Sequence, residues 1–235
     1  MTATRPATAP PATLAVSSGE PLSADLTARL TRCCEEAEDG RTAPAVMIRL
    51  TASEPDRSAG APWPGEVTSA AVNRWERAVR RLERLPVATV AVVEGDCRGP
   101  ALEVLLATDY RLARDGALIA FPSVGDRPWP GTALYRLTQQ LGIGRARSAV
   151  LFGVDLPMRR ALEWGLIDEL FASDGTAAAS ATIERLAPEQ GRELAIRRRL
   201  MFDAAVTGYE HALGAHLAAC DRELRRERPA EGSGR

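Results

Sequence analysis

The chain has 235 residues and a net charge of −1, with 30 basic and 31 acidic side chains. This length allows one large core, and the balanced charge gives no support for a nucleic-acid or anionic-membrane partner. No apolar run reaches the ~18 residues that a membrane span needs. The first residues, TATRPATAPPAT, contain no apolar segment of the signal-peptide type, so we expect a cytoplasmic protein.

Residue types that are missing or rare narrow the possible chemistry. All 30 basic residues are arginine, which excludes a lysine Schiff base and a P-loop lysine. The two histidines, His211 and His216, lie on one C-terminal segment, and the four cysteines lack metal-binding spacing. We therefore expect no bound metal and reduced thiols. Acid–base chemistry then depends mainly on carboxylates, cysteine, tyrosine or backbone dipoles.

Strands and helices alternate in the first half of the chain. Residues 1–12 are rich in Pro, Ala and Thr, and we expect them to be disordered. Ser23 is suited to cap a helix. The expected elements are a strand at 13–17, a helix at 24–38, a strand at 44–51, a polar loop at 53–65 and a helix at 67–85. This alternation indicates parallel βαβ units in a layered α/β fold.

Residues 86–131 form the central stretch of the sequence. The run PVATVAVVEG is typical of a buried parallel strand. It is followed by the glycine loop DCRGPA, an amphipathic segment LEVLLATDY of helical type, a short strand ALIAF and the loop PSVGDRPWPG. This order predicts a crevice at the carboxyl ends of parallel strands, with backbone N–H groups and polar side chains around it.

The second half is predicted to be mainly helical. Helices are expected at 132–141, 146–152 and 157–164, the last ended by Gly165, with a short strand at 166–170. We expect residues 13–174 to form the core, 175–228 a C-terminal helical region with a broad apolar surface, and 229–235 a disordered tail. Asp109 precedes a strand, and we expect it to make structural hydrogen bonds.

Several spaced motifs recur in a family order. The pattern EG-x3-G-x3-E, formed by Glu94, Gly95, Gly99 and Glu103, is followed by ATDYRLA, FP, PG, YRLTQQLGIGRARSAVLFG and ALEWGLIDEL. Together these motifs resemble the crotonase, or enoyl-CoA hydratase/isomerase, superfamily over roughly residues 14–223. The resemblance implies a spiral of ββα units with C-terminal helices that form a homotrimer or a dimer of trimers. It also implies a substrate carried as a coenzyme A thioester, with no other cofactor.

The family binds the thioester carbonyl in an oxyanion hole made of two backbone N–H groups. The resemblance assigns the first donor to Ala61, in the segment SAGAP. The second donor position corresponds to Pro100, which has no N–H. Gly99 or Ala101 takes this role only if the register slips. This departure argues against ordinary hydratase activity.

Family hydratases also use two glutamates. The first corresponds to Glu103, for which the structural alternative is a simple interaction with the dipole of its helix. The second corresponds to Ser123, which cannot exchange a proton as a carboxylate does. Asp126, three residues later, is a candidate substitute, although aspartates in loops usually stabilise turns. Arg127 is a candidate contact for a polar or anionic ligand, and Trp129 a candidate apolar wall of the pocket.

The segments VEGDCRGPALEVLLATDYRLA and WPGTALYRL resemble one subfamily in particular. It comprises the small crotonase-like proteins of 3,5-dihydroxyphenylacetyl-CoA biosynthesis, which assist a type III polyketide synthase. The first hypothesis is a hydratase/dehydratase-like enzyme that dehydrates and aromatises a polyketide thioester. The second is a catalytically degraded partner that binds the synthase or its product and raises turnover. An ordinary fatty-acid hydratase fits least, because it needs both donors and both glutamates.

Overall fold

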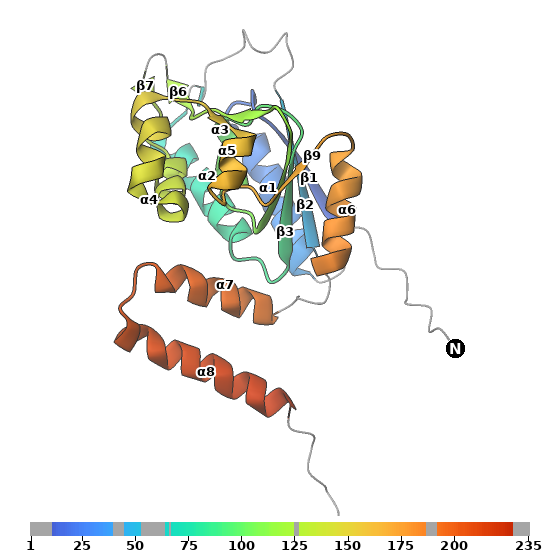
Figure 1. Ribbon diagram of the computed structural model, residues 1–235, viewed down its shortest axis with the longest axis vertical. Helices are drawn as coiled ribbons and strands as arrows, with labels where there is room; N and C mark the ends of the chain where they lie inside the picture. The colour runs from blue at the N-terminus through green and yellow to red at the C-terminus, as the bar shows by residue number, and fades with distance from the viewer. Residues whose placement is uncertain are drawn as a thin grey trace, which may run out of the picture.

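A five-stranded parallel sheet forms the centre of the protein (Figure 1). The computed structural model describes residues 11–39, 45–52, 64–65, 67–124, 127–186 and 192–227. The strand order is β1-β2-β3-β4-β9, and the strands span Ala12–Ser17, Ala45–Thr51, Ala88–Val93, Tyr110–Arg114 and Glu169–Phe171. Strands β1 to β4 follow one another in the sheet in the same order as in the sequence, so the chain advances in one direction, as in a spiral.

Helices cover both faces of this sheet. On one face lie α1 (Ala24–Glu38), α2 (Ser69–Leu82), α3 (Gly99–Leu105), α4 (Thr132–Phe152) and α5 (Met158–Glu163), and on the other lies α6 (Gly175–Leu186) (Figure 1). Successive side chains of a strand point to opposite faces. In β2, Val46 and Ile48 therefore pack with the larger group of helices, whereas Met47 packs on the side of α6.

The sequence predicts the limits of α1 correctly because its local signals are strong. Ser23 is the N-cap, and its Oγ accepts a hydrogen bond from the backbone N–H of Leu26 at 3.0 Å. The strand β1 begins at Ala12, one residue earlier than expected, because Ala12 is buried and pairs with β2. The expected break between two helices near residue 142 is also present. There Gly142 adopts a left-handed conformation, with φ 73°, inside α4.

The central stretch differs from its prediction in two elements. The helix expected at 102–110 is α3, which begins earlier, at Gly99, and ends at Leu105. Residues 110–114 form β4 of the main sheet, which confirms the strand expected directly after Asp109. The segment ALIAF contributes only β5 (Leu118–Ile119), which pairs with β8 (Leu156–Pro157) outside that sheet. The loop that follows contains a hairpin of β6 (Ser123–Val124) and β7 (Arg127–Pro128).

The C-terminal helices divide into two groups. Helix α6 belongs to the core: a Cβ added at Gly175 would lie 2.6 Å from atoms of Phe171 and Val92. Helices α7 (Arg192–Ala204) and α8 (Tyr209–Glu227) pack against each other below the sheet (Figure 1). Buried Arg198 anchors α7, because it donates to the Asp109 carboxylate at 2.6 and 2.7 Å and to the carbonyl oxygen of Leu85 at 2.5 Å. In the part of the chain that the structure describes, no helix is both long and apolar enough to cross a membrane.

Candidate active site

Glu103 is a buried carboxyl group at the centre of the candidate site. It lies on α3, which follows the carboxyl end of β3, and its exposed fraction is 1%. One carboxyl oxygen, Oε2, accepts a hydrogen bond from the indole N–H of Trp75 on α2. The other, Oε1, is buried and has no hydrogen-bond partner among the residues that the structure describes. A buried polar atom without a partner is unfavourable for stability, so such an atom in a native fold suggests a chemical role.

The surroundings of Glu103 favour its protonated form. Its pKa is raised from the ordinary value of 4.5 to about 7, mainly by burial and secondly by the nearby Glu76 carboxylate. The Trp75 hydrogen bond and the positive charge of Arg136 oppose this rise in pKa. A carboxyl group with a pKa near neutrality is present in both protonation states, which suits it to general acid–base catalysis.

Gly131 lies against the free oxygen of Glu103. It is the N-cap of α4, and a Cβ at this position would lie 2.7 Å from Oε1 of Glu103. The same Cβ would also lie 2.6 Å from Cδ1 of Trp129. The site therefore accepts no side chain at residue 131. Through this close packing the structure brings Trp129, a predicted pocket residue, next to Glu103.

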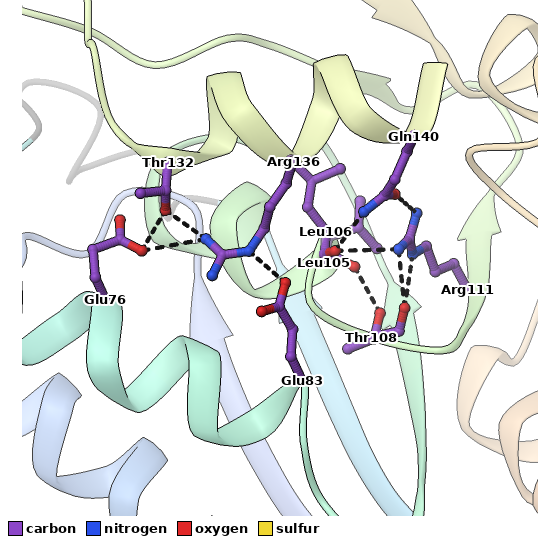
Figure 2. Close-up of polar contacts among 9 residues, drawn as sticks. All are labelled: Glu76, Glu83, Leu105, Leu106, Thr108, Arg111, Thr132, Arg136 and Gln140. Carbon is purple, nitrogen blue, oxygen red and sulfur yellow. Dashed lines mark hydrogen bonds and ion pairs between the residues drawn. The ribbon is translucent and has the colours of Figure 1, made fainter. Parts of the chain in front are cut away.

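A cluster of polar side chains joins α2 to the first turns of α4 (Figure 2). The guanidinium of Arg136 binds Glu76 at 3.2 Å and Glu83 at 2.7 Å. Thr132 donates its hydroxyl to Glu76 and accepts a hydrogen bond from Arg136 at 2.5 Å. This cluster is not among the residues predicted from the sequence. Its signal was the spacing of Thr132, Arg136 and Gln140, four residues apart on one face of a predicted helix.

A second group of contacts holds the C-terminal end of α3 (Figure 2). Arg111 donates to the carbonyl oxygens of Leu106 and Thr108 at 3.3 and 2.9 Å, and to Gln140 at 2.6 Å. Gln140 also donates to the carbonyl oxygen of Leu106 at 2.8 Å. Burial lowers the pKa of Arg111 to about 10. The helix that carries Glu103 is thus fixed to α4.

The first turn of α3 contains two of the three predicted oxyanion donors. Gly99 has a φ of 54°, a left-handed conformation that glycine adopts without strain, and is the first residue of α3. Pro100 follows it, and Ala101 is fully buried in the same turn. The first amides of a helix have no acceptor within the helix. Gly99 and Ala101 thus remain candidate donors, whereas Ala61 lies outside the described residues.

The other predicted residues have less to support them. Ser123 and Arg127 are exposed and lie in the β6–β7 hairpin, whereas Asp126 falls outside the described residues. Cys97 is buried, and burial raises the pKa of its thiol well above the ordinary range, which makes it a poor nucleophile. Asp109 has the structural role expected, because its carboxylate accepts from the backbone N–H and the hydroxyl of Thr89. Within the described ranges, no group of three His, Cys, Asp or Glu residues could hold a metal.

Comparisons with known proteins identify relatives of the whole chain. A family model described as enoyl-CoA hydratase/isomerase matches residues 22–219. An enoyl-CoA hydratase of Amycolatopsis orientalis is 43% identical over 214 residues, which cover 91% of this chain and 96% of that protein. An enoyl-CoA isomerase/hydratase of Penicillium crustosum is 34% identical over 143 residues, which cover 60% of this chain and 16% of that protein.

Solved structures show the same fold. A crystal structure of an enoyl-CoA hydratase from Shewanella pealeana superimposes with a TM-score of 0.75 at 18% identity, covering 96% of this chain and 88% of the other. One from a Polaromonas species superimposes with a TM-score of 0.74 at 20% identity, covering 92% and 90%. At these identities the likeness concerns the fold alone.

Proposed function

The chain belongs to the enoyl-CoA hydratase/isomerase family, and we propose that it acts on a CoA thioester and uses Glu103 to transfer a proton. The observation that carries this proposal is the Glu103 carboxyl itself. It has one oxygen held by Trp75, one oxygen without a partner in the described part of the chain and a pKa raised to about 7. It is also the position that corresponds to a glutamate of family hydratases.

The proposed reaction is the loss of water from a β-hydroxy thioester. The bond between the α-carbon and its hydrogen breaks, the bond from the β-carbon to the hydroxyl oxygen breaks, and a C=C bond forms. The Glu103 carboxylate takes the α-proton and returns it to the departing hydroxyl, which leaves as water. One carboxyl group with a pKa near neutrality can perform both transfers in turn. The reaction then requires no second carboxylate at Ser123.

Backbone amides near the start of α3 would stabilise the enolate. Gly99 and Ala101 have N–H groups in the first turn of α3, and Ala61 is the donor proposed on the other side of the carbonyl. A single lost donor typically lowers such rates by ~100-fold or more. Pro100 thus makes this protein a poor candidate for hydrating simple enoyl thioesters. Formation of an aromatic product supplies a driving force that ordinary hydration lacks.

We propose a polyketide thioester as the substrate. Dehydration and aromatisation would lead towards 3,5-dihydroxyphenylacetyl-CoA and assist a type III polyketide synthase. Support comes from the subfamily resemblance of residues 93–113 and 129–137 and from the altered oxyanion position. We also propose that the protein works in the cytoplasm with no cofactor other than the CoA carried by its substrate.

A homotrimer or a dimer of trimers is part of the proposal. Its support is the set of large apolar side chains that α7, α8 and the turn between them expose in a single chain. These are Met201, Phe202, Val206, Tyr209, Leu217 and Leu224. Light scattering coupled to size-exclusion chromatography tests this assembly, and a monomeric mass at micromolar concentration would contradict it.

The second candidate function is a binding partner without chemistry. Two observations favour it: Glu103 is only 1% exposed, and exposed Ser123 stands where family hydratases have their other glutamate. Such a partner would raise synthase turnover by binding the synthase or its product. It would need the fold and its surface but not the Glu103 carboxyl.

Mass spectrometry of synthase products separates the two functions. The cognate polyketide synthase is incubated with malonyl-CoA, alone and with wild-type protein, Glu103→Gln or Glu103→Ala. Glutamine retains an acceptor for Trp75 but cannot carry the proton. We expect wild type to increase the aromatic product and both variants to lose that increase. Glu163→Gln, at an exposed site on α5, is the matched control. Full stimulation by Glu103→Gln would refute the catalytic proposal and support the binding partner.

A further inference from the structure

We propose that Arg136 is a positioning residue for Glu103, acting through a cluster formed with Glu76, Glu83 and Thr132. This inference rests on the proposed function only where it concerns catalysis. Its structural content, that the cluster fixes the place and charge of Glu103, stands on the contacts between α2 and α4 (Figure 2).

Two pairs of neighbouring residues, one on α2 and one at the start of α4, enclose the Glu103 carboxyl. On α2, Trp75 donates to one oxygen of Glu103, and the next residue, Glu76, binds Thr132. On α4, Gly131 packs against the other oxygen of Glu103, and the next residue is Thr132 itself. The contact between Glu76 and Thr132 therefore fixes the separation of the two groups that enclose the carboxyl. Any drift of α2 from α4 would open the site of Glu103.

Arg136 extends this link along α2. It binds Glu76 and Glu83, which are seven residues apart and so lie on the same face of the helix, and its side chain is only 7% exposed. A guanidinium presents several donors in a fixed plane, so it can hold two carboxylates in one geometry. Glu83 is also the C-cap of α2, which means that Arg136 reaches the end of that helix.

The same residues determine the charge near Glu103. The charged groups that act on it are Glu76 from α2, which is negative, and Arg136 from α4, which is positive. Glu83 enters only through its ion pair with Arg136. Beta strands β1 and β2 meet α3 through apolar core side chains such as Leu14 and Ile48. Glu76 raises the pKa of Glu103 and Arg136 lowers it. Loss of Arg136 would leave two carboxylates without their common cation.

A titration of Glu103 tests the proposal without any assay of turnover. Infrared difference spectroscopy follows the carbonyl band of its protonated carboxyl, which Glu103→Gln identifies by removing it. We expect Arg136→Met to raise the midpoint by ~1 pH unit and Glu76→Gln to lower it by a similar amount. Arg136→Lys keeps the charge and should restore most of the wild-type midpoint.

The opposite signs distinguish positioning and charge control from mere structural support. If the cluster only packed the two helices together, both substitutions would loosen the site, admit water and lower the midpoint. Arg81→Met is the matched control, because Arg81 also joins α2 to two carboxylates, Glu35 and Glu38, but on the side of α1. Its midpoint for Glu103 should equal that of wild type.

Two results would overturn the proposal. One is an unchanged or lowered midpoint in folded Arg136→Met. The other is an unchanged midpoint in Glu76→Gln, which is nearly isosteric and remains informative if Arg136→Met does not fold. Expected midpoint shifts in a protein without dehydratase activity would contradict the proposed function and leave the cluster intact. A wild type with dehydratase activity, combined with variants whose midpoints do not shift, would contradict the role of the cluster and leave the proposed function intact.

Discussion

Replacing Glu103 with glutamine is expected to change the pH dependence of folding stability in a defined direction. The pKa of Glu103 is about 7 in the folded protein, against an ordinary value of 4.5 that represents the unfolded chain. Above pH 4.5 the unfolded chain releases this proton, whereas the folded protein keeps it up to about pH 7. The wild type therefore loses stability as the pH rises between these values, and glutamine does not.

The magnitude follows from the difference of about 2.5 units between the two pKa values of Glu103. At ~1.4 kcal/mol per unit, the loss of stability is about 3 kcal/mol when complete. The advantage of Glu103→Gln over wild type should thus be about 3 kcal/mol larger at pH 8 than at pH 4. Any pH-independent packing effect of the amide cancels in this double difference.

Urea unfolding at fixed protein concentration measures this double difference. Circular dichroism is the signal, and both proteins are examined at pH 4 and pH 8. Fixed concentration matters because assembly contributes to apparent stability. Glu163→Gln, at an exposed position, should give a double difference near zero. A value near zero or of opposite sign for Glu103→Gln would show that the buried carboxyl titrates normally, which would remove the main support for its catalytic role.

Two further predictions concern packing. Gly131→Ala should destabilise the protein by ~1–3 kcal/mol in urea unfolding and abolish stimulation of the synthase, because the added Cβ would overlap Trp129 and the Glu103 carboxyl. Gly144→Ala is the control, because nothing lies within 4 Å of a Cβ at that position. Equal behaviour of the two variants would contradict the close packing at Gly131. Arg198→Met should lower the free energy of unfolding by ~3 kcal/mol and increase proteolysis of α7 and α8, because it leaves Asp109 and two carbonyl oxygens without their buried donor. Arg199→Met, at an exposed position, should change neither stability nor proteolysis. Equal protease resistance of both variants would show that α7 is held by other contacts.

Local signals predicted much of the fold. The N-cap Ser23 and a regular apolar stripe were sufficient for both ends of α1, and the glycine at 142 for the break in α4. The limits of α3 and β5 were not predicted well. Both depend on pairing with distant segments. The chain after α3 pairs with β3 as β4, and only two residues of β5 pair with β8.

The candidate site was predicted in part. Glu103 and the glycine loop were identified from motif spacing, whereas Trp75 lay in the helix expected at 67–85 with no role assigned to it. That Trp75 donates to Glu103 depends on how α2 is rotated against α3, which local periodicity does not specify. Thr132 and Arg136 were predicted only to lie in a helix.

The sequence by itself determined the family, the alternation of strands and helices, and the presence of a carboxyl group on the turn after the glycine loop. These properties depend on residue order and on spacing within one segment. Only the tertiary structure decided that this carboxyl is buried, that one of its oxygens has no partner within the described ranges, and that Arg136 lies between two other carboxylates nearby. The physical reason is that desolvation and charge pairing depend on distances between segments far apart in the chain, and those distances exist only once α2, α3 and α4 have packed together.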